Sequence, residues 1–305
     1  MNILFASEKE KPDFWFPLLQ KALPEDRFFA WPDTNGGDID LALVATHPPG
    51  TFAGLKNLRL IQSLWMGVEN IVADPELPRG VPVARLIDPG MVHAMCETVI
   101  AWVLDWHRHF YLYRRWQREK TWKRRRQYLP SDRTVGILGL GELGSTVAAQ
   151  LKRLGFHVAG WSRRPKSLDG VYCSMDLDDV LSRSDAVVCL LPLTAHTRGI
   201  LGRDALSRIR KDGCVINVAR GGHVVIADLL AALDAGHLAH AYLDVFETEP
   251  LPQDSPLWTH PGVTVTPHIA ALSEPRTSVA KIAENVERVR RGELPGNLVD
   301  FAAGY

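Results

Sequence analysis

Three stretches of the chain each carry, just after an apolar run, a side chain suited to acid–base or anion chemistry. Arg220 follows CVINVA, Glu249 follows YLDVF and His268 follows VTVT. A histidine titrates near working pH and suits a proton donor, and a nearby carboxylate favours its charged form. An arginine can hold a carboxylate and polarise a carbonyl. Each residue alone is ordinary, but together they suit the reduction of a 2-keto acid, and we predict that they form a catalytic set.

A glycine-rich turn, GLGELG, stands between an apolar run and a helical pattern. Gly139, Gly141 and Gly144 allow a tight turn, a close approach of backbone to pyrophosphate, and close helix packing. The helix that starts at Glu142 and Leu143 points its N-terminus at negative phosphates. The turn therefore predicts a dinucleotide site.

The residues that follow the next apolar run, HVAGW, predict which dinucleotide is bound. An acid at this place normally binds the ribose 2′-hydroxyl of NAD, but here Ser162, Arg163 and Arg164 stand instead. Arginines hold a 2′-phosphate with forked, charge-assisted hydrogen bonds. We predict NADPH as the preferred cofactor, with NADH possible; the alternative is a solvated basic loop.

Short β-branched runs separated by helical patterns must position these residues. Continuous apolar strands alternating with helices predict parallel sheets covered on both faces, and so an α/β fold. Ligands bind beyond the carboxyl ends of such strands, where the three candidate catalytic residues can converge. The expected strands, in chain order, are NILFAS, LALVAT, LRLIQSL, VPVARL, TVGILGL, HVAGW, DAVVCLLPL, CVINVA, LAHAYLDVF and VTVTPH.

The segment from Met91 to about Trp116 contains neither proline nor glycine and predicts one long helix. This helix would carry the chain from a first domain into a second, and the helical pattern of residues 273–291 would return it. We therefore expect a discontinuous substrate-binding domain of residues 1–92 with 273–305, and a dinucleotide-binding domain of residues 93–272.

Composition is that of a globular protein. The chain has 305 residues, of which 46% are hydrophobic and 23% charged, and its formal net charge is zero. No apolar run approaches the roughly 20 residues that span a bilayer. The N-terminus predicts a core strand and not a signal peptide. The four cysteines form no CxxC pair, and we expect buried, reduced thiols in a cytoplasmic protein without a metal site.

These motifs together resemble the D-isomer-specific 2-hydroxyacid dehydrogenases. The resemblance lies in GLGELG, LLPLTAHTRGIL, GCVINVARGGHVV, AYLDVFETEPLP and TPHIAA. WSRRPKS, EPLPQDSPLW and the terminal AAGY are closer to the glyoxylate/hydroxypyruvate reductase A group. The resemblance covers most of the chain from Met91 onward and, more loosely, the first 90 residues.

The resemblance implies a homodimer whose subunits have two Rossmann-like, doubly wound domains with the active site in the cleft between them. It implies the catalytic roles of Arg220, Glu249 and His268, of which Arg220 and His268 also bind substrate. Further expected cofactor contacts are Leu191, Pro192, Thr197, Val218, Ala219, Asp244 and His268.

The resembling family also holds the substrate carboxylate on backbone amides of a loop that corresponds here to Trp65, Met66 and Gly67. The family often has small residues where Trp65 and Met66 stand. These side chains either line the substrate pocket or pack on the neighbouring domain. The nearby THPPG stretch, Thr46–Gly50, is either a cleft-facing loop or a rigid surface turn.

Residues 108–128 combine nine Lys or Arg with six aromatic residues. Such a mixture can bind single-stranded nucleic acid, but the resemblance implies a dimer contact with a solvated face, and we expect neither a nucleic-acid nor a membrane partner. The leading hypothesis is an NADPH-dependent reductase of glyoxylate- or hydroxypyruvate-like acids. The alternatives are an NAD-dependent 2-hydroxyacid dehydrogenase and a dinucleotide-sensing, co-repressor-like protein of the same fold.

Overall fold

The computed structural model describes residues 1–301 and divides into two compact units. Unit 1 consists of Met1–Met91 together with the segment that begins at Leu272, and unit 2 is Val92–Ala271. The AAGY motif lies outside the described residues. Each unit contains one sheet in which every strand pair is parallel, so the expected α/β fold with two doubly wound sheets is confirmed.

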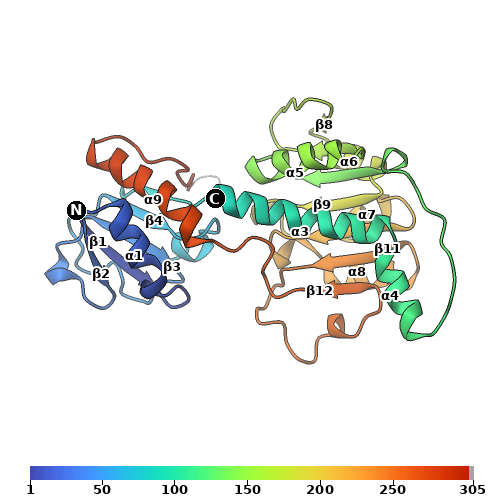
Figure 1. Ribbon diagram of the computed structural model, residues 1–305, viewed down its shortest axis with the longest axis horizontal. Helices are drawn as coiled ribbons and strands as arrows, with labels where there is room; N and C mark the ends of the chain where they lie inside the picture. The colour runs from blue at the N-terminus through green and yellow to red at the C-terminus, as the bar shows by residue number, and fades with distance from the viewer. Residues whose placement is uncertain (302–305) are drawn as a thin grey trace. The chain divides into compact units, whose positions relative to one another are not determined.

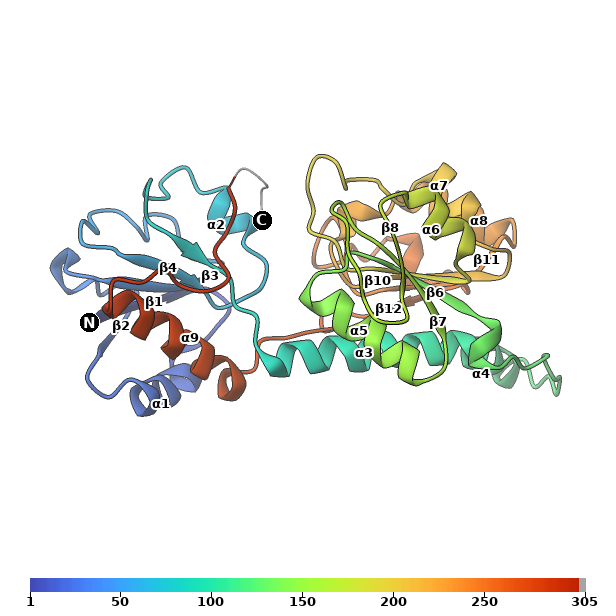
Figure 2. The same ribbon diagram turned by 90° about the horizontal axis from the view of Figure 1, so that it is seen from above.

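Unit 1 is a five-stranded sheet in the order β2-β1-β3-β4-β5. Alternate residues of its strands enter two hydrophobic clusters: Ile3 and Phe5 face one cluster, and Leu4 and Ala6 face the other. Helices α1 and α9 lie side by side on the first face, and α2 lies on the second (Figures 1 and 2). The elements are β1 Asn2–Ser7, α1 Pro12–Ala22, β2 Arg27–Ala30, η1 Asn35–Gly37, β3 Leu41–Ala45, β4 Leu60–Ser63, α2 Glu69–Val72, β5 Val83–Ala84 and α9 Pro275–Arg290.

Unit 2 is a seven-stranded sheet in the order β12-β11-β10-β9-β6-β7-β8. Counted from β6, this is the 3-2-1-4-5-6 order of dinucleotide-binding sheets with one strand added. Helices α3 and α5 cover one face, and α6, α7 and α8 cover the other (Figure 2). The elements are α3 Pro89–His107, α4 Phe110–Arg118, η2 Pro130–Asp132, β6 Thr134–Leu138, α5 Glu142–Arg153, β7 His157–Trp161, β8 Tyr172–Ser174, α6 Leu177–Arg183, β9 Ala186–Cys189, α7 Arg203–Arg208, β10 Gly213–Asn217, η3 Gly221–His223, α8 Ile226–Asp234, β11 Leu238–Leu243, η4 Pro256–Trp258 and β12 Val263–Val265.

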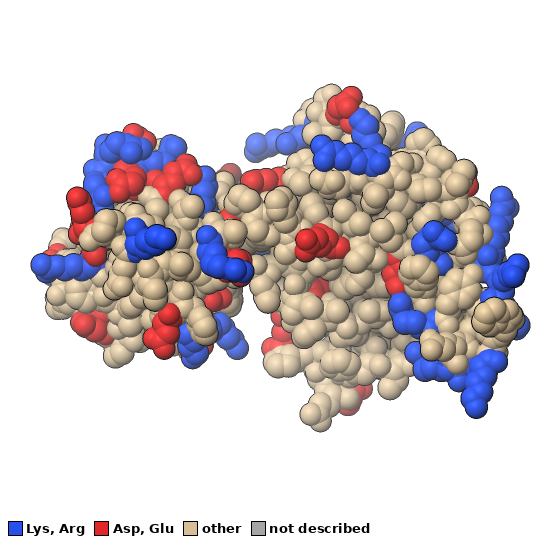
Figure 3. All heavy atoms as spheres, viewed as in Figure 1, with Lys and Arg blue, Asp and Glu red and all other residues tan. Residues whose placement is uncertain are grey.

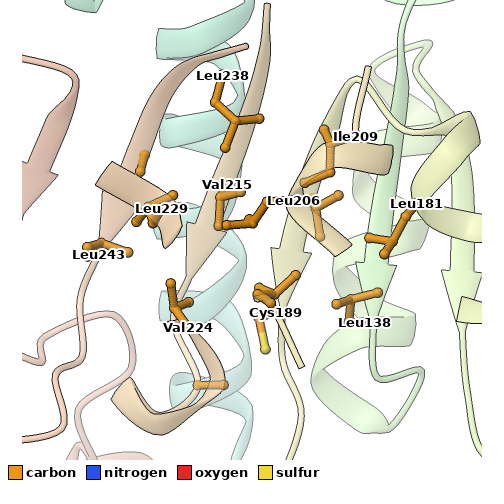
Figure 4. Packing of buried hydrophobic residues seen from close by; sticks show 14 of the residues in the cluster. Leu138, Leu181, Cys189, Leu206, Ile209, Val215, Val224, Leu229, Leu238 and Leu243 are labelled. Atoms are coloured by element: carbon orange, nitrogen blue, oxygen red, sulfur yellow. The ribbon is translucent and has the colours of Figure 1, made fainter. Parts of the chain in front are cut away.

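The core of unit 2 explains why its strands are apolar throughout. Leu138, Cys189, Val215 and Leu243 come from four neighbouring strands and are fully or almost fully buried in one cluster (Figure 4). Helix and loop residues such as Leu229 close this cluster from above the sheet. Because helices cover both faces, a polar residue inside one of these strands would lose its water.

The single helix expected over Met91–Trp116 is wrong, because the chain breaks at His109. This residue adopts a left-handed conformation with φ of 60° and separates α3 from α4. Its buried ring lies 3.1 Å, through Nε2, from the carbonyl oxygen of Arg126. A tertiary contact thus turns the chain where neither glycine nor proline marks a break. The short strands β2 and β8 were also not predicted, and both lie at or near a sheet edge.

The basic and aromatic segment that includes α4 gathers Lys and Arg side chains at one end of unit 2 (Figure 3). Several of these charges have partners within the unit: Arg114 makes two hydrogen bonds to Asp105, at 2.6 and 2.8 Å, and Arg125 lies 3.6 Å from Asp212. Trp122, in contrast, is 95% exposed. No helix within residues 1–301 is long and apolar enough to cross a membrane.

Candidate active site

The three candidate catalytic residues all follow strands at the carboxyl edge of the unit 2 sheet. Arg220 follows β10, Glu249 follows β11 and His268 follows β12. His268 Nδ1 lies 2.7 Å from Glu249 Oε2, and Glu249 Oε1 accepts a hydrogen bond of 2.9 Å from the backbone of Phe246. The imidazole is half exposed, with 48% of the side chain open to solvent. The carboxylate is thus fixed by one oxygen and orients the imidazole with the other.

Asp244, at the end of β11, shapes the turn that presents His268. Its buried carboxylate accepts hydrogen bonds from Thr266 Oγ1 at 2.6 Å and from the backbone amides of Ile269 and Ala270 at 2.9 Å each. The backbone amide of His268 donates to the Asp244 carbonyl at 2.8 Å. These bonds hold His268 at φ of 56°, a conformation uncommon outside glycine and often found at functional sites.

The turn that carries Arg220 is fixed by the strand before it. Asn217 Nδ2 donates to the Arg220 carbonyl at 2.9 Å, and Asn217 Oδ1 accepts from the Ala219 amide at 3.2 Å. The Arg220 guanidinium donates to the Ala219 carbonyl at 2.6 Å. The next residue, Gly221, packs so closely that a Cβ would lie 1.9 Å from the carbonyl carbon of Phe246. The Arg220 turn therefore contacts the loop that carries Glu249.

The glycine-rich turn lies between β6 and β9, where the strand order reverses. Gly139 has φ of 103°, and a Cβ there would lie 2.8 Å from the Leu190 carbonyl oxygen. A Cβ on Gly144 would lie 1.8 Å from the Gly139 carbonyl oxygen. Gly141 precedes Glu142, the first residue of α5, and among the described residues no side chain caps this helix. A close turn with an uncapped helix N-terminus fits the pyrophosphate of a dinucleotide.

The other predicted cofactor residues lie on the loops around this turn. Ser162 donates from Oγ to the Arg164 carbonyl at 2.6 Å in an exposed turn after β7, and Arg163 and Arg164 are both exposed. Leu191, Val218 and Ala219 are buried at strand ends, Pro192 is partly buried, and Leu143 is buried in α5. Thr197 donates from Oγ1 to the Pro192 carbonyl at 2.7 Å and so shapes this loop from within.

The predicted substrate loop lies in unit 1, after β4. The Trp65 ring packs against the unit 1 core, and its Nε1 donates to Glu10 Oε1 at 2.8 Å. The second oxygen of Glu10 accepts from Trp15 Nε1 at 3.0 Å. Trp65 is therefore anchored within its own unit, an arrangement that sequence analysis did not include. Met66 and Gly67 are partly buried.

The THPPG loop is also anchored within unit 1. His47 Nε2 lies 2.7 Å from Asp74 Oδ2. Burial is the largest single influence and raises the pKa of Asp74, but the hydrogen bond to His47 acts against it, and the net shift is downward. Gly50 donates its amide to Glu76 Oε2 at 3.1 Å. The loop is thus held rigidly at two points.

Sequence analysis missed several residues that position the site. Asn217 and His223 were not singled out, and Asp244 was expected at the cofactor rather than under His268. An asparagine that ends an otherwise apolar strand is a signal that could have drawn attention to Asn217, because such side chains bond nearby backbone. Within residues 1–301, no group of three or more His, Cys, Asp or Glu side chains could hold a metal ion.

Residues 100–270 match the family described as D-isomer specific 2-hydroxyacid dehydrogenase, NAD binding domain. This is more than half of the chain, and the chain belongs to the D-isomer specific 2-hydroxyacid dehydrogenase family. The family resemblance stated from the motifs is therefore confirmed, and the protein is an NAD(P)-dependent enzyme of this class.

Solved structures of similar proteins cover the whole chain. A D-isomer specific 2-hydroxyacid dehydrogenase from Xanthobacter autotrophicus Py2, in complex with NADPH and MES, is 41% identical over 100% of this chain and 99% of that one, with a TM-score of 0.95. The NADPH-dependent glyoxylate/hydroxypyruvate reductase of Sinorhizobium meliloti, in complex with NADP and sulfate, is 34% identical over 100% and 99%, with a TM-score of 0.92.

A third similar structure is a probable 2-hydroxyacid dehydrogenase from Rhizobium etli CFN 42. It was crystallised with NADP, HEPES and L(+)-tartaric acid. It is 33% identical over 100% of this chain and 99% of that one, with a TM-score of 0.90.

Proposed function

We propose that this enzyme reduces small 2-keto acids of the glyoxylate or hydroxypyruvate kind with NADPH. The observation that carries the proposal is the 2.7 Å contact between His268 Nδ1 and Glu249, on a sheet edge that also presents Arg220. Such a pair is suited to deliver one proton beside a bound carboxylate. The similar reductase from Sinorhizobium meliloti, by its description, acts on these acids with NADPH.

NADPH would bind across the carboxyl edge of the unit 2 sheet. The Gly139–Gly144 turn and the N-terminus of α5 would hold the pyrophosphate. Arg163 and Arg164 would bind the 2′-phosphate through forked hydrogen bonds, which a carboxylate at this place would oppose. Bound there, the cofactor supplies a hydride from C4 of its nicotinamide ring.

The protein's own residues would supply the rest of the reaction. The Arg220 guanidinium would bind the keto-acid carboxylate and polarise the carbonyl that receives the hydride. As the carbonyl oxygen becomes an alkoxide, His268 would transfer the proton on Nε2 to it and become neutral. Glu249 keeps the ring oriented through Nδ1. The backbone amides of Met66 and Gly67 would also bind the carboxylate.

The test is a comparison of cofactors and keto acids with the purified protein. NADPH or NADH is mixed with glyoxylate, hydroxypyruvate, pyruvate or phenylpyruvate, and absorbance of the reduced cofactor is followed. We expect rapid NADPH loss with glyoxylate or hydroxypyruvate and a much higher KM for NADH. Cofactor binding without turnover of any acid would overturn the proposal and favour a dinucleotide sensor.

We also propose that the enzyme is a cytoplasmic homodimer. The four cysteines are free thiols, three of them buried and Cys173 partly buried, as suits a reducing compartment. The exposed Trp122 and its basic neighbours offer a surface for a second copy. Light scattering after size exclusion should give twice the 34.0 kDa mass of one chain, and a monomer mass would contradict this.

A further inference from the structure

A fully buried histidine lies directly behind the Arg220 turn. His223 is 0% exposed, and both of its ring nitrogens face backbone carbonyl oxygens. Nδ1 lies 3.0 Å from the carbonyl oxygen of Arg220, and Nε2 lies 3.2 Å from that of Pro192. The ring therefore bridges two loops that are 28 residues apart in sequence, counted from Pro192 to Arg220.

The two bridged loops carry different parts of the proposed site. Pro192 belongs to the loop after β9, where the sequence predicts cofactor contacts, and Arg220 belongs to the turn after β10. Backbone hydrogen bonds already join these segments further along, from Gly199 to Gly222 at 2.8 Å and from Leu201 to His223 at 2.9 Å. The His223 ring adds a connection at the end nearest Arg220.

Burying the polar ring of His223 costs free energy that an apolar side chain in the same space would not. Desolvation is the largest influence and lowers the pKa of His223; the contacts with the Pro192 and Arg220 carbonyls raise it, and the charges of Arg220 and Arg198 lower it further. An apolar side chain would fill the same volume without a polar cost. A neutral imidazole carries one N–H, which one tautomer places on Nδ1 toward the Arg220 carbonyl and the other on Nε2 toward the Pro192 carbonyl. The ring can therefore donate to either loop, as a hydrocarbon cannot.

We propose that His223 is a positioning residue that holds the Arg220 turn against the Pro192 loop, and so sets the substrate-binding arginine relative to the cofactor. Asn217 fixes the Arg220 carbonyl from the strand side, at 2.9 Å, and His223 fixes it from the loop side. Loss of the Arg220 contact should weaken binding of the keto acid, and loss of the Pro192 contact should weaken binding of the cofactor. The inference rests on the proposed function, because it assigns the two ends to substrate and cofactor.

Two amide variants separate the two ends of the bridge. In His223→Asn the side-chain nitrogen takes the place of Nδ1 and keeps the Arg220 contact, whereas in His223→Gln it takes the place of Nε2 and keeps the Pro192 contact. His223→Phe keeps the ring and loses both contacts. His237→Gln is the matched control. His237 directly precedes β11, at the amino end of the strand, and its Nε2 lies 3.2 Å from the carbonyl oxygen of Leu206 in α7.

We expect a crossed pattern in steady-state kinetics. His223→Gln should raise the KM for the keto acid about fivefold and leave the KM for NADPH near wild type, since one hydrogen bond contributes about 1 kcal/mol. His223→Asn should do the reverse, and His223→Phe should raise both. His237→Gln should change neither KM, whatever its effect on Tm.

Two results would overturn the inference. In the first, both KM values move in parallel in the Asn and Gln variants, in proportion to Tm, which indicates a structural residue only. In the second, all three variants keep wild-type KM values. Wild-type turnover is measured first, and its absence would count against the proposed function; fluorescence titration with NADPH then still tests the Pro192 end, where His223→Asn should bind more weakly than His223→Gln.

Discussion

The two units share a doubly wound parallel architecture, yet only unit 2 has a turn suited to a dinucleotide. In unit 2 the first strand leads through Gly139 and Gly141 into α5, whose N-terminus is open. In unit 1 the corresponding turn, residues 8–11, is Glu-Lys-Glu-Lys, and α1 begins with Pro12, which has no amide to donate. Both helices carry an acidic residue in the first turn, Asp13 in α1 and Glu142 in α5. Turn chemistry, and not the fold, decides which unit binds phosphate.

The turns also differ in what their charged residues do. In unit 1 Glu10 binds two indole nitrogens, from Trp15 and Trp65, and so anchors a loop. In unit 2 Glu249 binds a half-exposed imidazole and leaves it open to a reactant. Carboxylates of the same kind are thus used for scaffolding in one unit and, under the proposed function, for chemistry in the other. The following experiments test that division.

The largest effect is expected from His268→Asn in unit 2. Removing the proton donor should lower kcat by about 10²- to 10⁴-fold, the range typical of general acid catalysis. NADPH affinity, measured by fluorescence titration, should stay within about twofold, because the glycine turn and arginines are untouched. Unchanged kcat would show that the proton comes from elsewhere.

The glycine turn can be broken in two different ways. In Gly144→Ala the new Cβ would lie 1.8 Å from the Gly139 carbonyl oxygen, so the turn must shift, at a cost of about 1–3 kcal/mol. We expect a lower Tm together with at least a roughly 100-fold loss of NADPH affinity.

Gly141→Ala is the matched variant for this comparison. Gly141 has negative φ, and no described atom lies within 4 Å of its new Cβ. Tm should therefore be unchanged, whereas NADPH affinity should fall about tenfold because the methyl group stands where the backbone approaches pyrophosphate. Equal affinity losses with equal Tm in both variants would contradict this account.

A smaller, cofactor-selective effect is expected from the double variant Arg163→Ala with Arg164→Ala. Loss of the forked contacts to the 2′-phosphate should raise the KM for NADPH by about 10- to 150-fold, at roughly 1.5–3 kcal/mol for bonds to charged groups. The KM for NADH should change by less than about twofold. Equal changes for both cofactors would indicate a solvated basic loop.

The anchor of the unit 1 loop should matter only to the keto acid. Trp65→Phe keeps the ring packing but loses the hydrogen bond to Glu10. Glu10→Gln leaves one oxygen to accept from an indole and puts an NH2, which cannot accept, against the other indole N–H. We expect the KM for the keto acid to rise about three- to fivefold in each variant, with the KM for NADPH unchanged. A change in the KM for NADPH alone would break the proposed division between the units.

The smallest effect concerns stability in acid. Burial lowers the pKa of His240 in unit 2 from 6.5 to about 4. Because the unfolded chain then binds a proton that the folded chain excludes, this contribution to stability is present above pH 6.5 and is lost as pH falls toward 4. At pH 5.5 the loss is about 1.4 kcal/mol.

The variant His240→Gln isolates this contribution. Glutamine keeps a polar contact to Thr264 Oγ1, which lies 2.8 Å from Nε2, but does not titrate. Its free energy of unfolding, from denaturant titrations at pH 7.5 and 5.5, should fall by about 1 kcal/mol less than that of wild type. Buried His107, His109 and His223 add losses of the same sign in unit 2. An identical pH dependence in the variant would place the acid sensitivity elsewhere.

The sequence by itself determined the parallel α/β architecture, the glycine turn and the family. Strand alternation, Gly139 to Gly144 and the order of Arg220, Glu249 and His268 are local patterns, and local patterns follow backbone propensity and turn chemistry. The strands β2 and β8 were missed because they have only four and three residues and lie at sheet edges.

Only the tertiary structure decided how distant residues meet. The helix break at His109 depends on a contact with Arg126, and the anchoring of Trp65 depends on Glu10, 55 residues earlier. The bridge from His223 to Pro192 spans 31 residues. These contacts join polar groups that are at least partly withdrawn from water, and such a group must find its partner wherever the fold brings one. The spacing of residues along the chain does not indicate which of these distant groups will come into contact.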